Sequence, residues 1–179
     1  KMRVLGLGFN VGGKGYLTTG DMIGYYVPVP NVGRFNDMME YDPSTDKWTE
    51  KAPLLLNLTG AWGMVINNKI YVGVGQTDMG DKTNQFWEYD PATDQWTRKA
   101  DFPGVPRNIG KGFSAGGKGY AGTGLFDGTT GLNDWWQYDP ISNTWSRKTD
   151  FPGAGRHFLP DFVLNDKIYA GAGWAAAKD

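Results

Sequence analysis

One eight-residue segment occurs three times in the sequence, and this repetition constrains the fold more than any other feature. The copies begin at Tyr41, Tyr89 and Tyr138, and each reads Tyr-Asp-Pro, four further residues and Trp. In each copy a strand ends on Tyr, a turn rich in Asp, Pro and hydroxyl or amide side chains follows, and Trp opens the return strand. The copies recur at intervals of roughly 50 residues, a period typical of repeat proteins. The chain is therefore predicted to be an array of β-hairpin units.

A second segment repeats between these hairpins. It has the form Lys-x-Tyr followed by Gly-containing positions, and it begins at Lys14, Lys69, Lys118 and Lys167. A pair of Gly, Asn or Asp residues suited to a tight turn precedes each copy, and a short apolar stretch precedes that pair. Each repeat thus holds four short antiparallel strands, as in the blade of a β-propeller. The 27 Gly and the 15% aromatic content favour an all-β chain, and no window shows an apolar pattern of helical period.

These segments resemble kelch repeats, a β-propeller family that includes the propeller of galactose oxidase. The Tyr-Asp-Pro-x-x-x-x-Trp segments and the Gly-containing strands carry the resemblance. The adjacent double Gly of the family is here Gly-x-Gly, and the first copy has Thr18 and Gly20 instead. The resemblance implies a kelch-type propeller of three four-stranded blades and the inner half of a fourth, with boundaries at 1–53, 54–104, 105–153 and 154–179.

Three and a half blades leave open edges, and propellers usually close a ring of about 4–8 blades. Two interpretations follow from this count. The sequence is a segment of a longer protein, or two copies form a homodimer that completes the propeller. The open edges also allow a purely structural role in assembly.

Composition narrows the classes of function. The net charge is -1, so the chain has no basic footprint for nucleic acid, and no apolar run is long enough to span a membrane. With no Cys and with His157 as the single His, we expect no metal site and no cofactor. The copper chemistry of galactose oxidase is rejected on the same grounds. No nucleophile–base pair is evident, and His157 is the one candidate for acid–base catalysis.

Arginine recurs at one position of the repeat. Arg3, Arg107 and Arg156 stand at the same distance before the Tyr of the Gly-containing strand, where repeat 2 has Leu58. This position lies at the start of the innermost strand, near the mouth of the propeller channel. Converging guanidinium groups there are predicted to bind a carboxylate, phosphate or sulfate. The alternative is that each Arg pairs with a local Asp or stacks on an aromatic ring.

The loops between the second and third strands supply the other candidate residues. In repeat 1 this loop is longer than its equivalents and carries Tyr25 and Tyr26, which suit a contact with a partner. In repeats 2 and 3 it carries Asp78, Phe126 and Asp127, which suit a sugar. The alternative for these polar residues is turn capping. The pairs Asn36-Asp37, Asn84-Gln85 and Asn133-Asp134 recur before the third strand and are interpreted as structural.

The sequence favours a binding module over an enzyme. We expect the face formed by the loops after the second and fourth strands to contact a protein or glycan, in particular an acidic ligand. The alternative function is that of an enzyme resembling sialic-acid epimerases, in which Arg3, Arg107 and Arg156 hold a carboxylate and His157 moves a proton. The Cys-free, Gly- and Thr-rich style resembles bacterial kelch proteins that are secreted, periplasmic or exposed at the cell surface.

Overall fold

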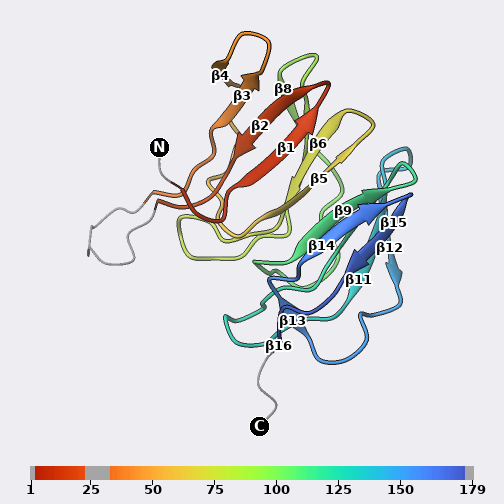
Figure 1. Cartoon of the computed structure of the whole chain (residues 1–179). Coiled ribbons are helices and arrows are strands. Elements are labelled where there is room, and N and C mark those ends of the chain that lie inside the picture. Colours follow the sequence, from red (N-terminus) through yellow and green to blue (C-terminus); the bar gives the residue numbers. More distant parts are fainter. Residues whose placement is uncertain (1–2, 23–32, 176–179) are drawn as a thin grey trace.

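The computed structural model of the chain describes residues 3–22 and 33–175, which form strands, turns and loops without a helix (Figure 1). The strands are β1 (Leu7–Val11), β2 (Lys14–Thr18), β3 (Met38–Asp42), β4 (Lys47–Lys51), β5 (Trp62–Ile66), β6 (Lys69–Gly73), β7 (Phe86–Asp90), β8 (Gln95–Arg98), β9 (Lys111–Ala115), β10 (Lys118–Gly122), β11 (Trp135–Asp139), β12 (Thr144–Lys148), β13 (Arg156–His157), β14 (Asp161–Leu164), β15 (Lys167–Ala170) and β16 (Trp174–Ala175). The described part of the chain therefore contains no helix that could cross a membrane.

The first twelve strands form three antiparallel sheets of four strands, in the orders β1-β2-β3-β4, β5-β6-β7-β8 and β9-β10-β11-β12. A smaller fourth unit follows, in which β14 pairs with β15 and β13 pairs with β16. The sheets fan out so that β1, β5, β9 and β14 lie along the inner edge (Figure 1). The predicted all-β propeller of three four-stranded blades and a partial fourth is confirmed. We call the sheets blades 1, 2 and 3.

Each Tyr-Asp-Pro segment forms the hairpin turn between the third and fourth strands of a blade. In blade 2 the Asp90 carboxylate accepts a hydrogen bond from the N–H of Ala92 at 2.9 Å, and the Tyr89 hydroxyl donates to Asp94 at 2.7 Å. Asp94 has φ of 56°, a left-handed conformation that Asp and Asn tolerate better than most residues. The same bonds recur between Asp42 and Ser44, Tyr41 and Asp46, Asp139 and Ile141, and Tyr138 and Asn143. The turn is therefore closed by its own residues.

The Gly after the second strand allows two segments of one repeat to approach closely. Gly124 has φ of +100°, and a Cβ on this residue would lie 2.6 Å from the carbonyl oxygen of Asn108. The residue before it, Thr123, also has a positive φ, of 56°. Two consecutive residues after β10 thus have a positive φ, and only the second of them is a Gly.

The blades are joined by the segment that leaves the fourth strand. After blade 1, the N–H of Ala52 donates to Asp94 at 2.9 Å and its carbonyl accepts from Trp96 Nε1 at 2.8 Å. Two residues later, the buried Leu54 packs in the core cluster that contains Trp87. After blade 2, Ala100 makes the same two bonds with Asn143 and Trp145, and Phe102 is buried between the blades. Trp96 and Trp145 therefore each fix the contact of their blade with the preceding one, as well as filling space.

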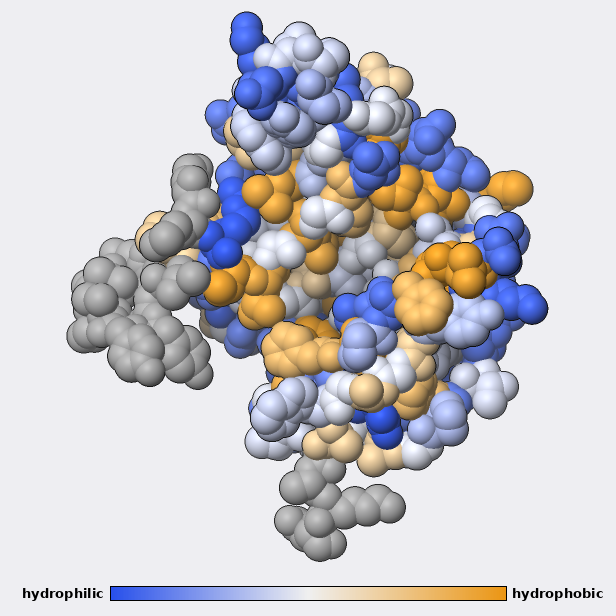
Figure 2. Space-filling model, in the orientation of Figure 1, coloured by the Kyte–Doolittle hydropathy of each residue, from blue (hydrophilic) through white to orange (hydrophobic). Residues whose placement is uncertain are grey.

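The inner strands border a small cavity. Its volume is 210 Å³, and residues of β1, β5 and β9 and of the segment before β14 line it. Apolar side chains surround the hollow in the middle of the view in Figure 2. Lys111 of β9 forms an ion pair of 2.5 Å with Asp161 at the start of β14, which joins the fourth unit to blade 3.

Candidate functional site: the loop face

One face of the propeller carries the loops that vary between repeats. We call it the loop face; its described residues are 19–22, 33–37, 52–61, 74–85, 99–110, 123–134 and 149–160. Because the strands of a blade alternate in direction, these loops lie together, at the lower left of Figure 1 and opposite the hairpin turns. Varied loops on a rigid scaffold are the usual place for binding residues.

The bases of these loops are rigid. Gln76 forms β-bridges with Thr59 and Lys82 in repeat 2, and Leu125 forms them with Asn108 and Gly131 in repeat 3. The backbone also links the repeats here, through hydrogen bonds of 2.8 to 2.9 Å from the N–H of three glycines to a carbonyl of the next repeat: Gly20 to Leu58, Gly75 to Arg107 and Gly124 to Arg156. The loop face is therefore a preformed surface, at least at its base.

The recurrent arginine of repeat 3 is held inside the protein. Arg107 is 0% exposed, and its two terminal nitrogens contact the two carboxylate oxygens of Asp134 at 2.5 and 2.9 Å. The guanidinium also donates to the carbonyls of Thr123 and Val105 and lies 4.8 Å from the centroid of the Phe102 ring. Its hydrogen-bonding capacity is therefore largely used within the repeat.

The carboxyl group of this ion pair titrates below its usual range. Burial raises the pKa of Asp134, but the hydrogen bond and charge of Arg107 and the bond from Trp136 Nε1 at 2.7 Å outweigh it, so the pKa is lowered. The carboxylate is therefore ionised at neutral pH, and the pair behaves as a structural link between the first and third strands of the blade.

The other repeats vary this arrangement. The two terminal nitrogens of Arg3 likewise donate to the two carboxylate oxygens of Asp37, at 2.8 and 2.7 Å, and the guanidinium lies 4.6 Å from the centroid of the Phe35 ring. Repeat 2 has the apolar Leu58 and the neutral Gln85 in the two positions. Arg156 donates to the carbonyls of Ala154 and Ala172 and lies 4.9 Å from the Phe151 ring, but it contacts no carboxylate among the described residues.

The sequence analysis gave a local ion pair and an aromatic contact as the alternative to ligand binding, and both are present at Arg3 and Arg107. Arg156 has the aromatic contact but no carboxylate partner among the described residues. The predicted structural role of Asp37 and Asp134 explains the closure of the first two. Ligand binding by the three arginines stays a prediction, and Arg156 is the member with donors available for it.

Two predicted acidic residues have partners within the loops. Asp78 accepts a hydrogen bond from the side-chain amide of Asn57. Asp127 accepts from the backbone N–H of Thr129 at 2.9 Å and from that of Thr130 at 2.6 Å, and these bonds hold its pKa well below the usual range. Both side chains lie on the loop face, where they stabilise the loops in the way turn capping requires.

The remaining predicted residues are placed as follows. Phe126 lies on the loop face and is partly exposed. His157 is half-buried, its Nδ1 has no hydrogen bond within the described residues, and burial lowers its pKa. Tyr25 and Tyr26 lie outside the described residues. The residues that the structure describes contain no group of His and acidic side chains able to hold a metal ion.

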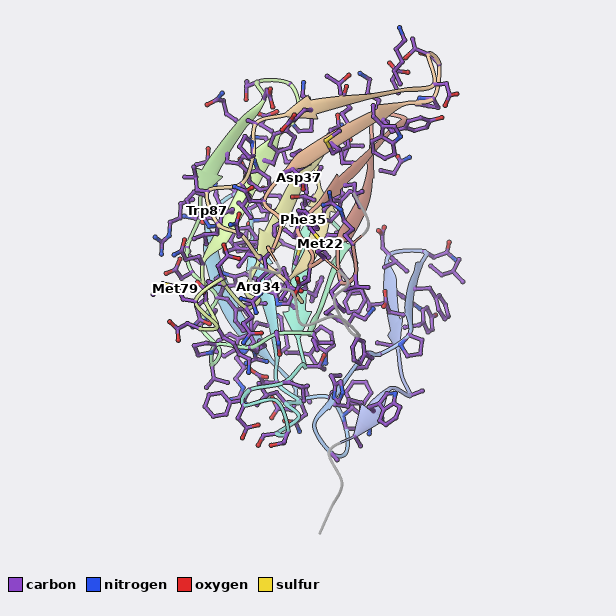
Figure 3. All side chains as sticks on the ribbon, turned by 90° about the vertical axis from the view of Figure 1, so that its left-hand side faces the viewer. Met22, Arg34, Phe35, Asp37, Met79 and Trp87 are labelled. Carbon is purple, nitrogen blue, oxygen red and sulfur yellow. The ribbon has the colours of Figure 1, made fainter. Side chains whose placement is uncertain are left out.

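The loop face also carries a set of exposed apolar side chains, of which only Phe126 was among the predicted site residues. Met79 is 89% exposed and Leu55 is 71% exposed. We call the set the apolar loop residues: Met22, Leu55, Met79, Val105 and Phe126. Each comes from a different loop, and Figure 3 shows Met22 and Met79 with Arg34 between them in that view. In the sequence, each of these residues stands out only as an apolar residue within a polar loop. This is a weak indication of a binding surface, because single exposed apolar residues are common.

Polar contacts join the loops that carry these residues. The bond between Asn57 and Asp78 ties the loop of Leu55 to that of Met79, and Lys82 Nζ donates to the carbonyl of Phe126 from the same loop as Met79. Arg34 donates to the side chain of Gln76 at 3.3 Å, which ties the first repeat to the second. The apolar loop residues therefore belong to connected loops and form part of one surface.

Comparison with known proteins agrees with the repeat and the fold. The family model described as the kelch motif matches residues 63–103, which span β5 to β8 and the segment after blade 2. Residues 63–103 thus carry a kelch motif, and the chain has the fold of a kelch-type β-propeller. The kelch chain is also similar to a solved structure titled "Structure of YjhT", with a TM-score of 0.79 at 16% identity over 93% of this chain. The match spans 58% of the length of that structure. Comparison with curated proteins gives no match.

Proposed function

We propose that this kelch propeller is a binding module and that its loop face contacts a protein partner. The observation that carries the proposal is the exposure of the apolar loop residues on connected loops of one face. Kelch propellers suggest a binding or interaction role in general, and the composition of the face supports a protein as the ligand. Met, Leu and Val side chains adapt to apolar protein surfaces, and among the apolar loop residues Phe126 alone offers a ring on which a sugar could stack.

The energetics support an intermolecular role for these side chains. Full burial of a Leu or Met side chain contributes about 1.5–3 kcal/mol relative to exposure. Leu55 is 71% exposed, beside the fully buried Leu54, so it contributes little of this free energy to the folding of the free protein. A partner that covered both Leu55 and Met79 would gain this free energy of burial on binding. An acidic group of the partner would find a donor at Arg156, whose terminal nitrogens bond no carboxylate among the described residues.

The test compares the loop face with the opposite face. Extract of the source cells is passed over the immobilised wild-type protein, the Leu55→Asp/Met79→Asp variant and the Ile141→Asp variant, and bound proteins are identified by mass spectrometry. Ile141 is 92% exposed in the hairpin turn on the opposite face and serves as the matched control. We expect one or more proteins to be retained by the wild type and by Ile141→Asp but lost from the double variant.

Two outcomes would contradict the proposal. The first is retention of the same proteins by the double variant, with an unchanged circular dichroism spectrum. The second is saturable binding to a sugar on a glycan array without any specific protein capture, which would assign the loop face to carbohydrate.

A further inference from the structure

Three neighbouring loops of the loop face expose only negative charge. They are residues 52–61, 74–85 and 123–134, which carry the apolar loop residues Leu55, Met79 and Phe126 in that order. The exposed charged residues of these loops are Asp78, Asp81 and Asp127. The surface around the exposed apolar side chains is therefore acidic.

These three carboxylates have no cation as a partner in the part of the chain that the structure describes. The nearest candidate, Lys82, is half-buried, and its ammonium group donates to the carbonyl of Phe126. Two other carboxylates of the loop face are neutralised: Asp101 pairs with Arg98 at 2.9 Å, and Asp150 pairs with Arg147 at 3.0 Å. The missing counterions are thus a property of the loops that carry the exposed apolar side chains.

Asp78 adjoins the two most exposed of these apolar side chains. It precedes Met79 in the sequence, and its Oδ2 accepts from the side-chain amide of Asn57 in the loop of Leu55. Its Oδ1 accepts no hydrogen bond from a described residue. A partner that covers Leu55 and Met79 must therefore remove water from this carboxylate, which is costly unless a cation pairs with it.

The charge of these loops disfavours several kinds of occupant. A second copy of the chain would place carboxylates against carboxylates, and nucleic acid and anionic lipid would be repelled as well. The described residues hold no group of three or more His and acidic side chains that could bind a metal ion. A cationic segment of a protein satisfies both the apolar side chains and the carboxylates.

We propose that the partner segment bound by the loop face is basic and apolar, with Lys or Arg residues next to Leu, Met or aromatic residues. Its apolar side chains cover Leu55, Met79 and Phe126. Its cations lie beside the carboxylates of Asp78 and Asp81. This inference rests on the proposed function, and it adds the chemistry of the partner.

A basic partner differs from the acidic ligand expected from the recurrent arginines. Arg3 and Arg107 bond to Asp37 and Asp134 of their own repeats, so their charge is neutralised within the protein. Asp127, in contrast, stays ionised at the surface, because hydrogen bonds from the N–H groups of residues 130 and 129 lower its pKa. The exposed carboxylates are therefore the charges that a partner meets on these loops.

The test begins with a phage library of random peptides of about 12 residues, selected on the immobilised wild-type protein. We expect the enriched peptides to combine two or more Lys or Arg residues with Leu, Met or aromatic residues. Affinity of the best peptide, measured by fluorescence anisotropy, should fall at least about five-fold between about 50 and about 500 mM NaCl, because exposed ion pairs are screened by salt. Replacing its apolar residues by Ser should weaken binding at least about ten-fold.

Two double variants then locate the charges on the loop face. Asp78→Asn/Asp81→Asn keeps an acceptor for Asn57 and should bind the peptide about five-fold more weakly in low salt. Asp101→Asn/Asp150→Asn is the matched control: it changes the net charge equally on the same face, but removes carboxylates that already have Arg partners. The control should bind within about two-fold of the wild type.

The proposal is overturned if no peptide is enriched, if the enriched peptides carry no excess of Lys and Arg, or if the two double variants weaken binding equally. It is also overturned if the Ser-substituted peptide binds as well as its parent, because the surface would then select for charge alone. Uncharged apolar peptides that bind the wild type but not Leu55→Asp/Met79→Asp would leave the proposed function standing and remove only this inference. Basic peptides that bind Leu55→Asp/Met79→Asp as well as the wild type would contradict both.

Discussion

Removal of the Asp134 carboxylate should destabilise blade 3 by about 3–5 kcal/mol, the range for breaking a buried ion pair by truncating one partner. Arg107 is 0% exposed, so Asp134→Ala would leave its charge inside the protein with only the carbonyls of Thr123 and Val105 as acceptors. Trp136 Nε1 would lose its acceptor as well. The loss is measured as a change in the free energy of unfolding, by urea denaturation followed by Trp fluorescence.

Repeat 2 supplies the control, because it folds with Leu58 and Gln85 in the two positions. The double variant Arg107→Leu/Asp134→Gln places the same two residue types at the corresponding positions of repeat 3. Replacing a buried ion pair by groups that leave no charge unpaired is often close to neutral, so we expect the double variant to cost less than Asp134→Ala alone. Gln85 accepts from Trp87 Nε1 at 3.2 Å, and the new Gln should accept from Trp136 in the same way.

A double-mutant cycle with Arg107→Leu and Asp134→Gln should give a coupling energy of about 2 kcal/mol or more, within the range for residues in contact. Additive effects within 0.5 kcal/mol, on the order of the scatter for independent sites, would refute the assignment of this pair as a structural link. The assignment would also fail if Asp134→Ala cost under about 1 kcal/mol, the value typical of an exposed ion pair.

The same pair gives a pH dependence of known sign. The folded-state pKa of Asp134 is lowered, so its contribution is present above the unfolded pKa of about 3.9 and is lost as the pH falls through the lower folded value. The free energy of unfolding of the wild type should therefore fall in acid below about pH 4. The fall should be smaller in Arg107→Leu/Asp134→Gln, and an identical acid profile of the two proteins would contradict the cause given for the shift.

Two further predictions concern the repeated backbone and side-chain contacts. Gly124→Ala should destabilise the protein by more than about 2 kcal/mol, because its Cβ would meet the carbonyl of Asn108. Gly128→Ala is the control, with φ of +97° and nothing within 4 Å of its Cβ, and should cost about 1 kcal/mol. Equal costs of the two variants in urea denaturation would refute the role of the close approach. Tyr71→Phe should cost about 1–3 kcal/mol because it removes a buried hydrogen bond to Glu88, and thermal unfolding that is unchanged would contradict this.

The candidate site was predicted in part. The recurrence of Arg3, Arg107 and Arg156 and the structural role of Asp37 and Asp134 were both readable from the repeat. Their pairing was not, because Arg107 and Asp134 are 27 residues apart and the match depends on how the first and third strands of a blade align. Apart from Phe126, the apolar loop residues were missed for a related reason. Leu54 and Leu55 are alike in sequence, and only the docking of blade 1 on blade 2 decides that Leu54 is buried and Leu55 is exposed.

The amino-acid sequence alone determined the order and type of the strands in the three complete blades. Each hairpin is closed by bonds between residues two to five apart, such as Tyr89 to Asp94, so local turn chemistry and the alternation of apolar residues are sufficient to specify it. The tertiary structure decided which hydrogen-bond donors find an acceptor and which apolar side chains are buried. Those at Arg107 and Trp96 are satisfied by residues from other strands or the preceding blade, while Arg156 and Trp48 lack these partners among the described residues. Contacts of this kind depend on surfaces brought together by packing, which the local pattern does not record.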